Sequence, residues 1–269
     1  MPHARLVGFL SRAALACAAV FSLTACDVVV NTMEGGRSTA TDLWAKTYTL
    51  QDGAQIAVVN TNGHIDVEGV DGTTLDVKAE ITARAGTDEA ARELLKQVEI
   101  REEAGTARIR LETRYPKGLG RSSVSVKYTL RVPRSAKVEV ETVNGGIRVA
   151  DVSGAVRAET TNGGVKASGV KGALTATSTN GGIDVQVLAV TSEGVSLETT
   201  NGAINLRLPG EAKGTISARC VNGGISVSDL DVAKTESSRR RLEGTLNGGG
   251  PAIRLETVNG GIKVHRSQG

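Results

Sequence analysis

The chain has 269 residues and is nearly balanced in charge, with 32 lysines and arginines against 29 aspartates and glutamates. Arg5 and Arg12 fall in a leader that we expect to be removed, which leaves 30 basic residues against 29 acidic ones. A net charge this close to zero gives the protein no electrostatic reason to bind nucleic acid or an anionic surface. Only 2% of the residues are aromatic and none follows Tyr128, so the second half offers no stacking platform for bases or sugars.

Residues 1–26 are typical of a secretory signal that ends in a lipidation motif. A basic start is followed by an apolar run over residues 13–21, which is too short to span a bilayer, since a spanning helix takes about 20 residues. The sequence Leu-Thr-Ala-Cys at residues 23–26 resembles the lipobox of bacterial lipoproteins. The resemblance implies that Cys26 carries the lipid. The alternative is an ordinary cleaved export signal with an incidental cysteine.

Lipidation at Cys26 predicts an exported protein anchored to the bacterial cell envelope, on the periplasmic face of a membrane or at the cell surface. Several acyl chains hold far more firmly than one. Cys17 lies inside the signal, which leaves Cys220 without an intramolecular disulfide partner. An exported protein without disulfides must draw its stability from its own core.

Residues 27–42, with Gly35-Gly36, Ser38 and three threonines, are predicted to form a flexible tether. Residues 43–135 are predicted to be the N-terminal part of a β domain. The elements expected there are an opening rung (55–59 and 65–67 around Asn62-Gly63), a strand (75–83), a helix (88–97), a hairpin (98–101 with 107–113), a polar loop (115–123) and a strand (125–132).

The helix has a recognisable start and one apolar face. Thr87 is placed to cap it, and Asp88 and Glu89 suit the positive end of its dipole. Its apolar face consists of Ala91, Leu94, Leu95 and Val98. We expect it to cover an end or a flank of the sheet, which protects an open edge from edge-to-edge association.

An Asn-Gly pair recurs seven times, each time followed one residue later by an aliphatic residue that opens a short strand. The asparagines are Asn62, Asn144, Asn162, Asn180, Asn201, Asn222 and Asn259. From Asn144 onward the spacings are 18, 18, 21, 21 and 37 residues, which indicates single rungs followed by a double step in which one rung lacks the asparagine. This period is typical of a solenoid, so residues 136–266 are predicted to be regular rungs.

Apolar and polar residues alternate on both sides of each pair, which places one set inside and the other in water. The inward position two residues before the asparagine forms a small, mostly hydroxyl column, in which each hydroxyl needs a hydrogen-bond partner. This column consists of Thr142, Thr160, Ser178, Thr199, Cys220 and Thr257.

An Asn-Gly pair usually makes a hairpin, but a hairpin would reverse the chain at once, so recurrence in register indicates the corner of a coil. Stacked rungs lie about 4.8 Å apart, so the asparagines can bond from turn to turn, and the glycine supplies the backbone freedom of the corner. The predicted fold class is all-β: a β-solenoid of stacked short strands with Asn-Gly turns and one short helix near the N-terminal half. Its structural turn ladder is Asn144, Asn162, Asn180, Asn201, Asn222 and Asn259.

Several segments carry a family resemblance when they are taken in order. They are Asn60-Thr61-Asn62-Gly63, the helix followed by Val98-Glu99-Ile100, Thr113-Arg114-Tyr115-Pro116, residues 128–133 leading into 142–146, and residues 248–251 leading into 259–261. Together they resemble the DUF4097 putative-adhesin family of bacterial β-strand repeat proteins over about residues 45–265. The resemblance implies an adhesin-like role, which is inferred for the family from its repeats, and it brings no catalytic or binding residue.

No catalytic, cofactor or metal site is predicted. The outward glutamates three residues before the asparagines, such as Glu141 and Glu159, are interrupted by other residues and suit a solvated stripe. His64, His265 and the buried Cys220 do not converge on a metal or nucleophilic site. Residues 180–185 lack the Gly-x-Asp of calcium-binding nonapeptides.

We therefore expect a non-enzymatic, lipid-anchored cell-envelope protein that acts in adhesin-like binding or as a structural scaffold. Its expected partners are a membrane, through lipidated Cys26, and an envelope protein or the extracellular matrix, and not nucleic acid. Two alternatives stay open: a polysaccharide-active β-helix enzyme and an envelope-stress or signalling accessory protein. The breaks in the repeat attract attention for function, namely residues 115–123 and 237–251, where Arg239-Arg240-Arg241 suits either an anionic ligand site or a salt-bridged edge.

Overall fold

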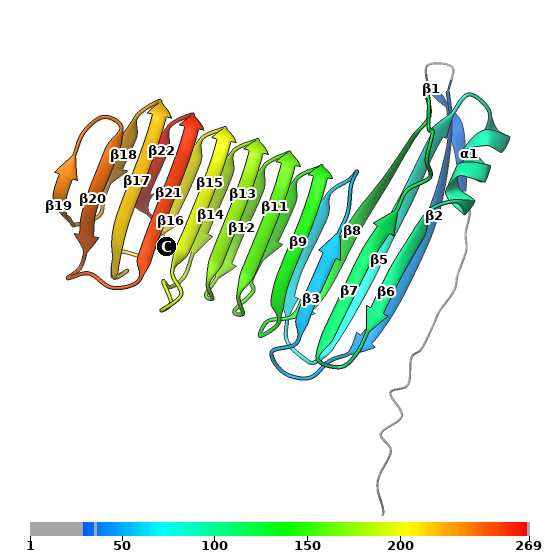
Figure 1. Ribbon diagram of the computed structural model, residues 1–269. Helices are drawn as coiled ribbons and strands as arrows, with labels where there is room; N and C mark the ends of the chain where they lie inside the picture. The colour runs from blue at the N-terminus through cyan, green and yellow to red at the C-terminus, as the bar shows by residue number, and fades with distance from the viewer. Residues whose placement is uncertain (1–28, 35–36, 268–269) are drawn as a thin grey trace, which may run out of the picture.

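The computed structural model describes residues 29–34 and 37–267, with side chains from Arg37 onward. Two eleven-stranded sheets face each other and enclose a long apolar core (Figure 1). One helix lies at the N-terminal end of this stack. The predicted all-β solenoid is confirmed. The signal, Cys26 and Gly35-Gly36 lie outside the described residues.

Sheet A contains, in spatial order, β1 (Val29–Glu34), β2 (Arg37–Thr49), β5 (Thr74–Ala85), β8 (Ser123–Pro133), β4 (Ile65–Val70), β10 (Ile147–Ala150), β12 (Val165–Val170), β14 (Ile183–Val187), β16 (Ile204–Leu208), β22 (Ile262–Arg266) and β18 (Ile225–Ser228). Sheet B contains β19 (Val232–Ser237), β20 (Arg241–Leu246), β17 (Gly214–Asn222), β21 (Ala252–Asn259), β15 (Val195–Asn201), β13 (Leu174–Asn180), β11 (Val156–Asn162), β9 (Lys137–Asn144), β3 (Gln55–Val59), β7 (Arg108–Arg114) and β6 (Glu99–Ala104).

Each regular rung consists of a strand in sheet B, an Asn-Gly corner and a strand in sheet A. Neighbouring rungs pair in parallel and in full register, so that Asn162 lies between Asn144 and Asn180. The inward residues of both sheets, such as Ile183 and Leu197, are almost completely buried. Alternation with period two therefore separates the core from the solvent faces, as the sequence predicts.

The seven asparagines form one continuous ladder along the corner. In each rung the side-chain Nδ2 donates to the Oδ1 of the asparagine in the neighbouring rung, over 2.7 to 2.9 Å. The ladder runs in the order Asn62, Asn144, Asn162, Asn180, Asn201, Asn259 and Asn222. Its members at 144 and beyond are exposed to solvent.

The inward hydroxyls find their partners at the same corner. Thr160 Oγ1 donates to the carbonyl of Gly145 in the preceding rung over 2.8 Å. The same bond to the equivalent glycine is made by Thr142, Ser178, Thr199 and Thr257. Cys220 departs from the pattern, since its Sγ lies 4.0 Å from the carbonyl of Arg239. The buried hydroxyl column thus closes the narrow end of the core without unsatisfied groups.

The first glycine of each pair is required for space and not, as expected, for backbone freedom. Of the seven, Gly63 alone has a positive φ. At Gly163, Gly181 and their equivalents, a Cβ atom would overlap the carbonyl group of the glycine one rung away. Every other residue type has a Cβ, so the close approach of successive corners admits glycine alone.

The order of the last two rungs differs from the expectation of a double step. β21 and β22, which are last in the sequence, lie between β15/β16 and β17/β18. The chain leaves β18 and forms the antiparallel strands β19 and β20 beyond β17. It then crosses back through Asn247 and three glycines, all with positive φ. The 37-residue spacing thus contains a hairpin and not a rung without asparagine.

The N-terminal half continues the same sheets across the expected boundary at residues 135 and 136. β3 and β4 pair in parallel with β9 and β10, so the opening rung stacks directly on the first regular one. β6 and β7 form the predicted hairpin. α1 (Asp88–Lys96) is capped by Thr87, which accepts from the Ala90 N–H, and it packs against β2 and β5 through the buried Ala91 and Leu95.

The predicted flexible tether at residues 27–42 is wrong for residues 29–34 and 37–42, because Val29–Glu34 form β1, which pairs antiparallel with β2. Residues 37–42 are the first half of β2, which pairs with β5 from Ser38 opposite Ala85 onward. Ser38 and Ala40 are buried, and Thr39 and Thr41 beside them are β-branched residues that suit a strand. The small polar residues that suggested a linker are an alternating strand whose inward residues are small.

Replacing Asn180 with alanine should lower the free energy of unfolding by about 1 kcal/mol, because it removes one hydrogen bond on each side of the ladder at an exposed position. Urea unfolding measures the change. The matched control is Thr179→Ala, an exposed neighbour whose side chain makes no hydrogen bond in the described structure. Equal midpoints for the two variants would show that the ladder adds no stability.

The two glycines after Asn180 should differ sharply. Gly181→Ala forces a Cβ onto the Gly163 carbonyl and should destabilise by about 3 kcal/mol or abolish folding. Gly182→Ala should leave the urea midpoint almost unchanged, because Ala203 occupies the equivalent position in the next rung. A similar loss in both variants would contradict the close-approach explanation.

Candidate binding trough on sheet A

The outer faces of the two sheets carry different charges. In the six strands β10, β12, β14, β16, β22 and β18 of sheet A there are five basic residues and one acidic residue. Their partner strands in sheet B, β9, β11, β13, β15, β21 and β17, have four basic residues and five acidic ones. The near-neutral chain therefore presents a basic face and a weakly acidic face, and this asymmetry directs attention to sheet A.

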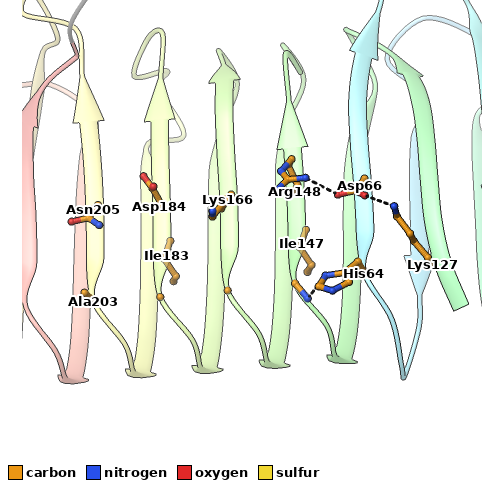
Figure 2. A pocket seen from close by; sticks show the side chains of 13 residues that line it. His64, Asp66, Lys127, Ile147, Arg148, Lys166, Ile183, Asp184, Ala203 and Asn205 are labelled. Atoms are coloured by element: carbon orange, nitrogen blue, oxygen red, sulfur yellow. Dashed lines mark hydrogen bonds and ion pairs between the residues drawn. The ribbon is translucent and has the colours of Figure 1, made fainter. Parts of the chain in front are cut away.

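A trough of about 640 Å³ runs across the strands of this basic face. Its floor is the residue two places after each asparagine, which has little or no side chain: Gly146, Gly164, Gly182 and Ala203. One wall is the outward column two residues further on, which consists of Asp66, Arg148, Lys166, Asp184 and Asn205 (Figure 2). His64 and Lys127 lie at one end.

The charges in the wall are partly paired. Asp66 lies between Lys127 and Arg148, with oxygen to nitrogen distances of 3.7 and 3.5 Å. Asp184 pairs with Arg207 over 2.6 Å. Lys166 stands between these two groups, exposed and without an acidic partner in the described structure. A free ammonium group therefore lies at the middle of the trough.

Backbone N–H groups also line the trough. The N–H of Gly146 donates to Nδ1 of His64 over 3.0 Å, so an imidazole nitrogen covers the first donor of the row (Figure 2). The equivalent N–H groups of Gly164, Gly182 and Ala203 have no acceptor within residues 37–267. Successive rungs repeat about every 4.8 Å, so the floor is a row of regularly spaced hydrogen-bond donors.

The residues considered for catalysis do not gather in one site, and the pocket that Glu141 and Glu159 line is only about 40 Å³. Glu141 and Glu159 lie side by side on the outer face of sheet B, and Glu159 pairs with Arg157. His265 lies next to Arg207 on sheet A, and Cys220 is buried. In the part of the chain that the structure describes, no three His, Cys, Asp or Glu side chains gather as a metal site would require.

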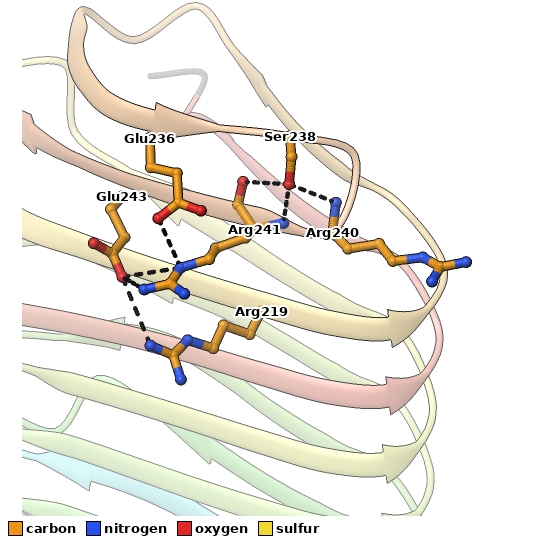
Figure 3. A network of polar contacts seen from close by, with 6 residues as sticks. All are labelled: Arg219, Glu236, Ser238, Arg240, Arg241 and Glu243. Carbon is orange, nitrogen blue, oxygen red and sulfur yellow. Dashed lines mark hydrogen bonds and ion pairs between the residues drawn. The ribbon is translucent and has the colours of Figure 1, made fainter.

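In the run Arg239-Arg240-Arg241, Arg241 forms salt bridges and Arg240 forms none with the described residues. Arg241 contacts Glu236 over 2.9 Å and Glu243 over 2.6 Å, and Arg219 approaches Glu243 from β17 (Figure 3). The hydrogen bond from Arg241 lowers the pKa of Glu243. The side chain of Arg240 points away from this network. One arginine therefore fixes the edge, as the salt-bridged interpretation expects.

The 115–123 loop takes the place of an Asn-Gly corner between β7 and β8. Tyr115 turns its hydroxyl inward, where it donates to Oδ1 of Asn60 over 2.7 Å and accepts from the N–H of Asn62 over 3.2 Å. Asn60 is buried and donates to the carbonyl of Val126 over 2.8 Å. Tyr115 therefore supports the first rung and is not an open sugar platform.

No trough is predicted from the sequence, although the sequence contains a pattern that indicates one. The repeat reads Asn-Gly-Gly in most rungs, and the second glycine has no structural need as strict as that of the first, since Ala203 replaces it. A column of small outward residues beside a charged column indicates a groove. The groove can be recognised only when both columns are known to lie on the outer face of the same sheet.

Alkaline pH should destabilise the protein through its buried tyrosines. Burial raises the pKa of Tyr115 from 10.0 to about 12, against backbone hydrogen bonds that lower it. Above pH 10 the unfolded tyrosine ionises while the folded one stays neutral, so stability is complete below pH 10 and falls as the pH rises toward 12. For Tyr115 the loss should be about 1 to 2 kcal/mol, allowing for its partial exposure.

Urea unfolding at pH 10 and pH 12 of the wild type and Tyr115→Phe measures this share. The variant should be about 1 kcal/mol less stable at neutral pH, because Asn60 loses its donor, and it should lose less stability on alkalinisation. Tyr48 and Tyr128, whose pKa values burial also raises, remain in both proteins. The same alkaline loss in both would contradict the assignment.

No helix in the described part of the chain has the length and apolar character needed to cross a membrane. No curated protein matches the sequence. Among solved structures, similarity extends over 84% of this chain to proteins of 11 to 13% identity.

One is a "putative cell adhesion protein" from Clostridium sporogenes, with 12% identity, a TM-score of 0.46 and 100% of its own length covered. Another is a "putative adhesin" from Bacteroides fragilis, with 13% identity, a TM-score of 0.36 and 97% covered. A third is a "putative lipid binding protein" from Parabacteroides distasonis, with 11% identity, a TM-score of 0.30 and 97% covered. The family model described as Toastrack DUF4097 matches residues 95–265, and the chain therefore belongs to the Toastrack DUF4097 family.

Proposed function

We propose that the protein is a non-enzymatic component of the bacterial cell envelope that is anchored by lipid at Cys26 and makes adhesin-like contacts through the outer face of sheet A. The observation that carries this proposal is the trough, a continuous surface that repeats the same backbone donors along the stack and has the free ammonium group of Lys166 at its middle. A long repetitive surface suits a large, repetitive partner better than it suits a small molecule, which binds in enclosed pockets.

The shape of the molecule supports the same function. The end with α1 and the end formed by β18, β19 and β20 lie at opposite ends of the stack (Figure 1). A lipid near the N-terminus would leave the whole length of the rungs facing away from the anchor. The trough begins at His64 and extends toward the C-terminal rungs, where a partner outside the membrane can reach it.

An enzymatic role has less support. Hydrolysis of glycosidic bonds needs an acid and a second carboxylate on either side of the scissile bond. The trough has Asp66 and Asp184, but both carboxylates are held by basic side chains and lie three rungs apart on one wall. Glu141 and Glu159 lie on the other sheet. Binding without turnover is the function that this arrangement suits.

The proposal can be tested in cells that express the full-length chain. Gly182→Gln places a long neutral side chain in the trough, at a position whose backbone is not left-handed and where Ala203 shows that a Cβ is accommodated one rung away. We expect it to lower cell aggregation or surface adhesion to the level of the gene deletion, with the protein still present in the membrane fraction.

Two cysteine variants test the anchor in the same strains. Cys26→Ala should lose incorporation of labelled fatty acid and release the protein from membranes, whereas Cys17→Ala, whose cysteine lies inside the signal, should behave as wild type. Thr161→Gln, an exposed position on sheet B, is the control for a long side chain at the wrong face. Normal adhesion of the deletion strain, or of Gly182→Gln cells, would overturn the proposed contact function.

A further inference from the structure

We propose that the trough binds an extended anionic glycan, a linear chain of sugars with carboxylate or sulfate groups, which lies across the strands and along the axis of the stack. The inference rests on the proposed function of the outer face of sheet A and gives the chemical class of its partner. Three independent features of the described residues carry it: the backbone donors, the excess of positive charge and the linear repeat.

The backbone donors call for a ligand rich in acceptors. His64 shows what suits the row, because its Nδ1 accepts from the N–H of Gly146 over 3.0 Å. Gly164, Gly182 and Ala203 present the same group without an acceptor in the described chain. Rows of backbone N–H groups favour anionic oxygens, and charge-assisted hydrogen bonds are stronger than neutral ones. A hydroxyl-rich chain with acidic groups supplies such oxygens repeatedly.

The charge of the face favours an anion over a cation. Lys166 is exposed and free of acidic partners, and Lys263 continues the same column three strands further along. Asp66 and Asp184 are each engaged by basic side chains. The paired carboxylates give the trough little negative potential of its own, while the ammonium groups remain available. The acidic residues on the outer face of sheet B would repel the same ligand.

The linear repeat distinguishes between polymers. Each rung advances about 4.8 Å and offers one donor and one wall residue, so a ligand must be extended and repetitive along this axis. Single-stranded nucleic acid would need aromatic platforms for its bases, and none of the residues that line the trough is aromatic. The glycan is therefore held by charge and by backbone hydrogen bonds and not by stacking on aromatic rings. An extended peptide satisfies its own backbone along a strand at a sheet edge, whereas the trough runs across the strands.

Binding can be measured with the full-length lipidated protein in detergent. The probes are dextran sulfate and polygalacturonate, which carry sulfate and carboxylate groups, with uncharged dextran as the matched neutral chain. We expect both acidic polymers to bind, dextran to bind at least about tenfold more weakly, and the affinity for the acidic polymers to fall steeply with salt. Binding of one acidic polymer alone identifies which acidic group the trough accepts.

Substitutions locate the site. Lys166→Gln should weaken acidic-glycan binding by about three- to tenfold, and Gly182→Gln should abolish it. The matched control is Lys137→Gln, which removes the same charge from the exposed outer face of sheet B and should change nothing. Unchanged urea midpoints confirm that each variant is folded.

Equal binding of dextran, or equal losses in Lys166→Gln and Lys137→Gln, would overturn the inference. Tighter binding of single-stranded DNA or of polyglutamate than of either glycan would overturn the assignment to a glycan. These failures are distinct from a failure of the proposed function. If Gly182→Gln abolishes cell adhesion but no acidic glycan binds, the face is a contact surface for another partner; if adhesion is normal, the contact function itself is wrong.

Discussion

The close approach of backbones at the corner of each rung is the constraint on which the whole solenoid depends. At Gly163 and its equivalents, no Cβ fits against the carbonyl of the neighbouring rung. That carbonyl accepts the hydroxyl of the inward threonine or serine, and the asparagine beside it bonds to its neighbour. Sterics, a buried hydrogen bond and an exposed amide ladder thus coincide within two residues, which explains why Asn-Gly repeats while the strand residues vary within their apolar or polar class.

Equivalent corners also explain how the chain can build its stack out of sequence order. β21 presents the same asparagine and glycine as every other rung, after a small inward residue, so it pairs in full register with β15 on one side and β17 on the other. Nothing in the corner distinguishes one level from the next. The distinction comes from the hairpin of β19 and β20, which pairs with the far side of β17 and leaves a place for the last rung.

The same regularity that stabilises the molecule creates the trough on sheet A. From Asn144 onward, the residue two places after each asparagine faces outward and is glycine or alanine, so it leaves an open strip along the sheet. This strip is the floor of the trough, and its backbone N–H groups after Gly146 have no acceptor in the described chain. The irregular segments have the opposite role. Tyr115 holds the first rung through Asn60, and Arg241 joins β19 and β20 through Glu236 and Glu243. The sequence suggests the two breaks in the repeat, residues 115–123 and 237–251, as places of function. In the structure, Tyr115 and Arg241 in these breaks have structural contacts.

The sequence by itself determined the elements and the inside of this protein, because the alternation around Asn180, the cap at Thr87 and the hydroxyl column at Thr160 are local patterns with local physical causes. It also determined that the asparagines would stack, since the same apolar and polar alternation on both sides of each Asn-Gly pair aligns the rungs in one register. Tertiary structure alone decided the position of β21 between β15 and β17, the incorporation of residues 37–42 into β2, and the joining of Gly164, Gly182 and Lys166 into one trough. These features depend on which strands become neighbours in the sheet. Rungs with nearly the same sequence can stack on one another in more than one order, so the sequence of a rung does not specify its neighbour.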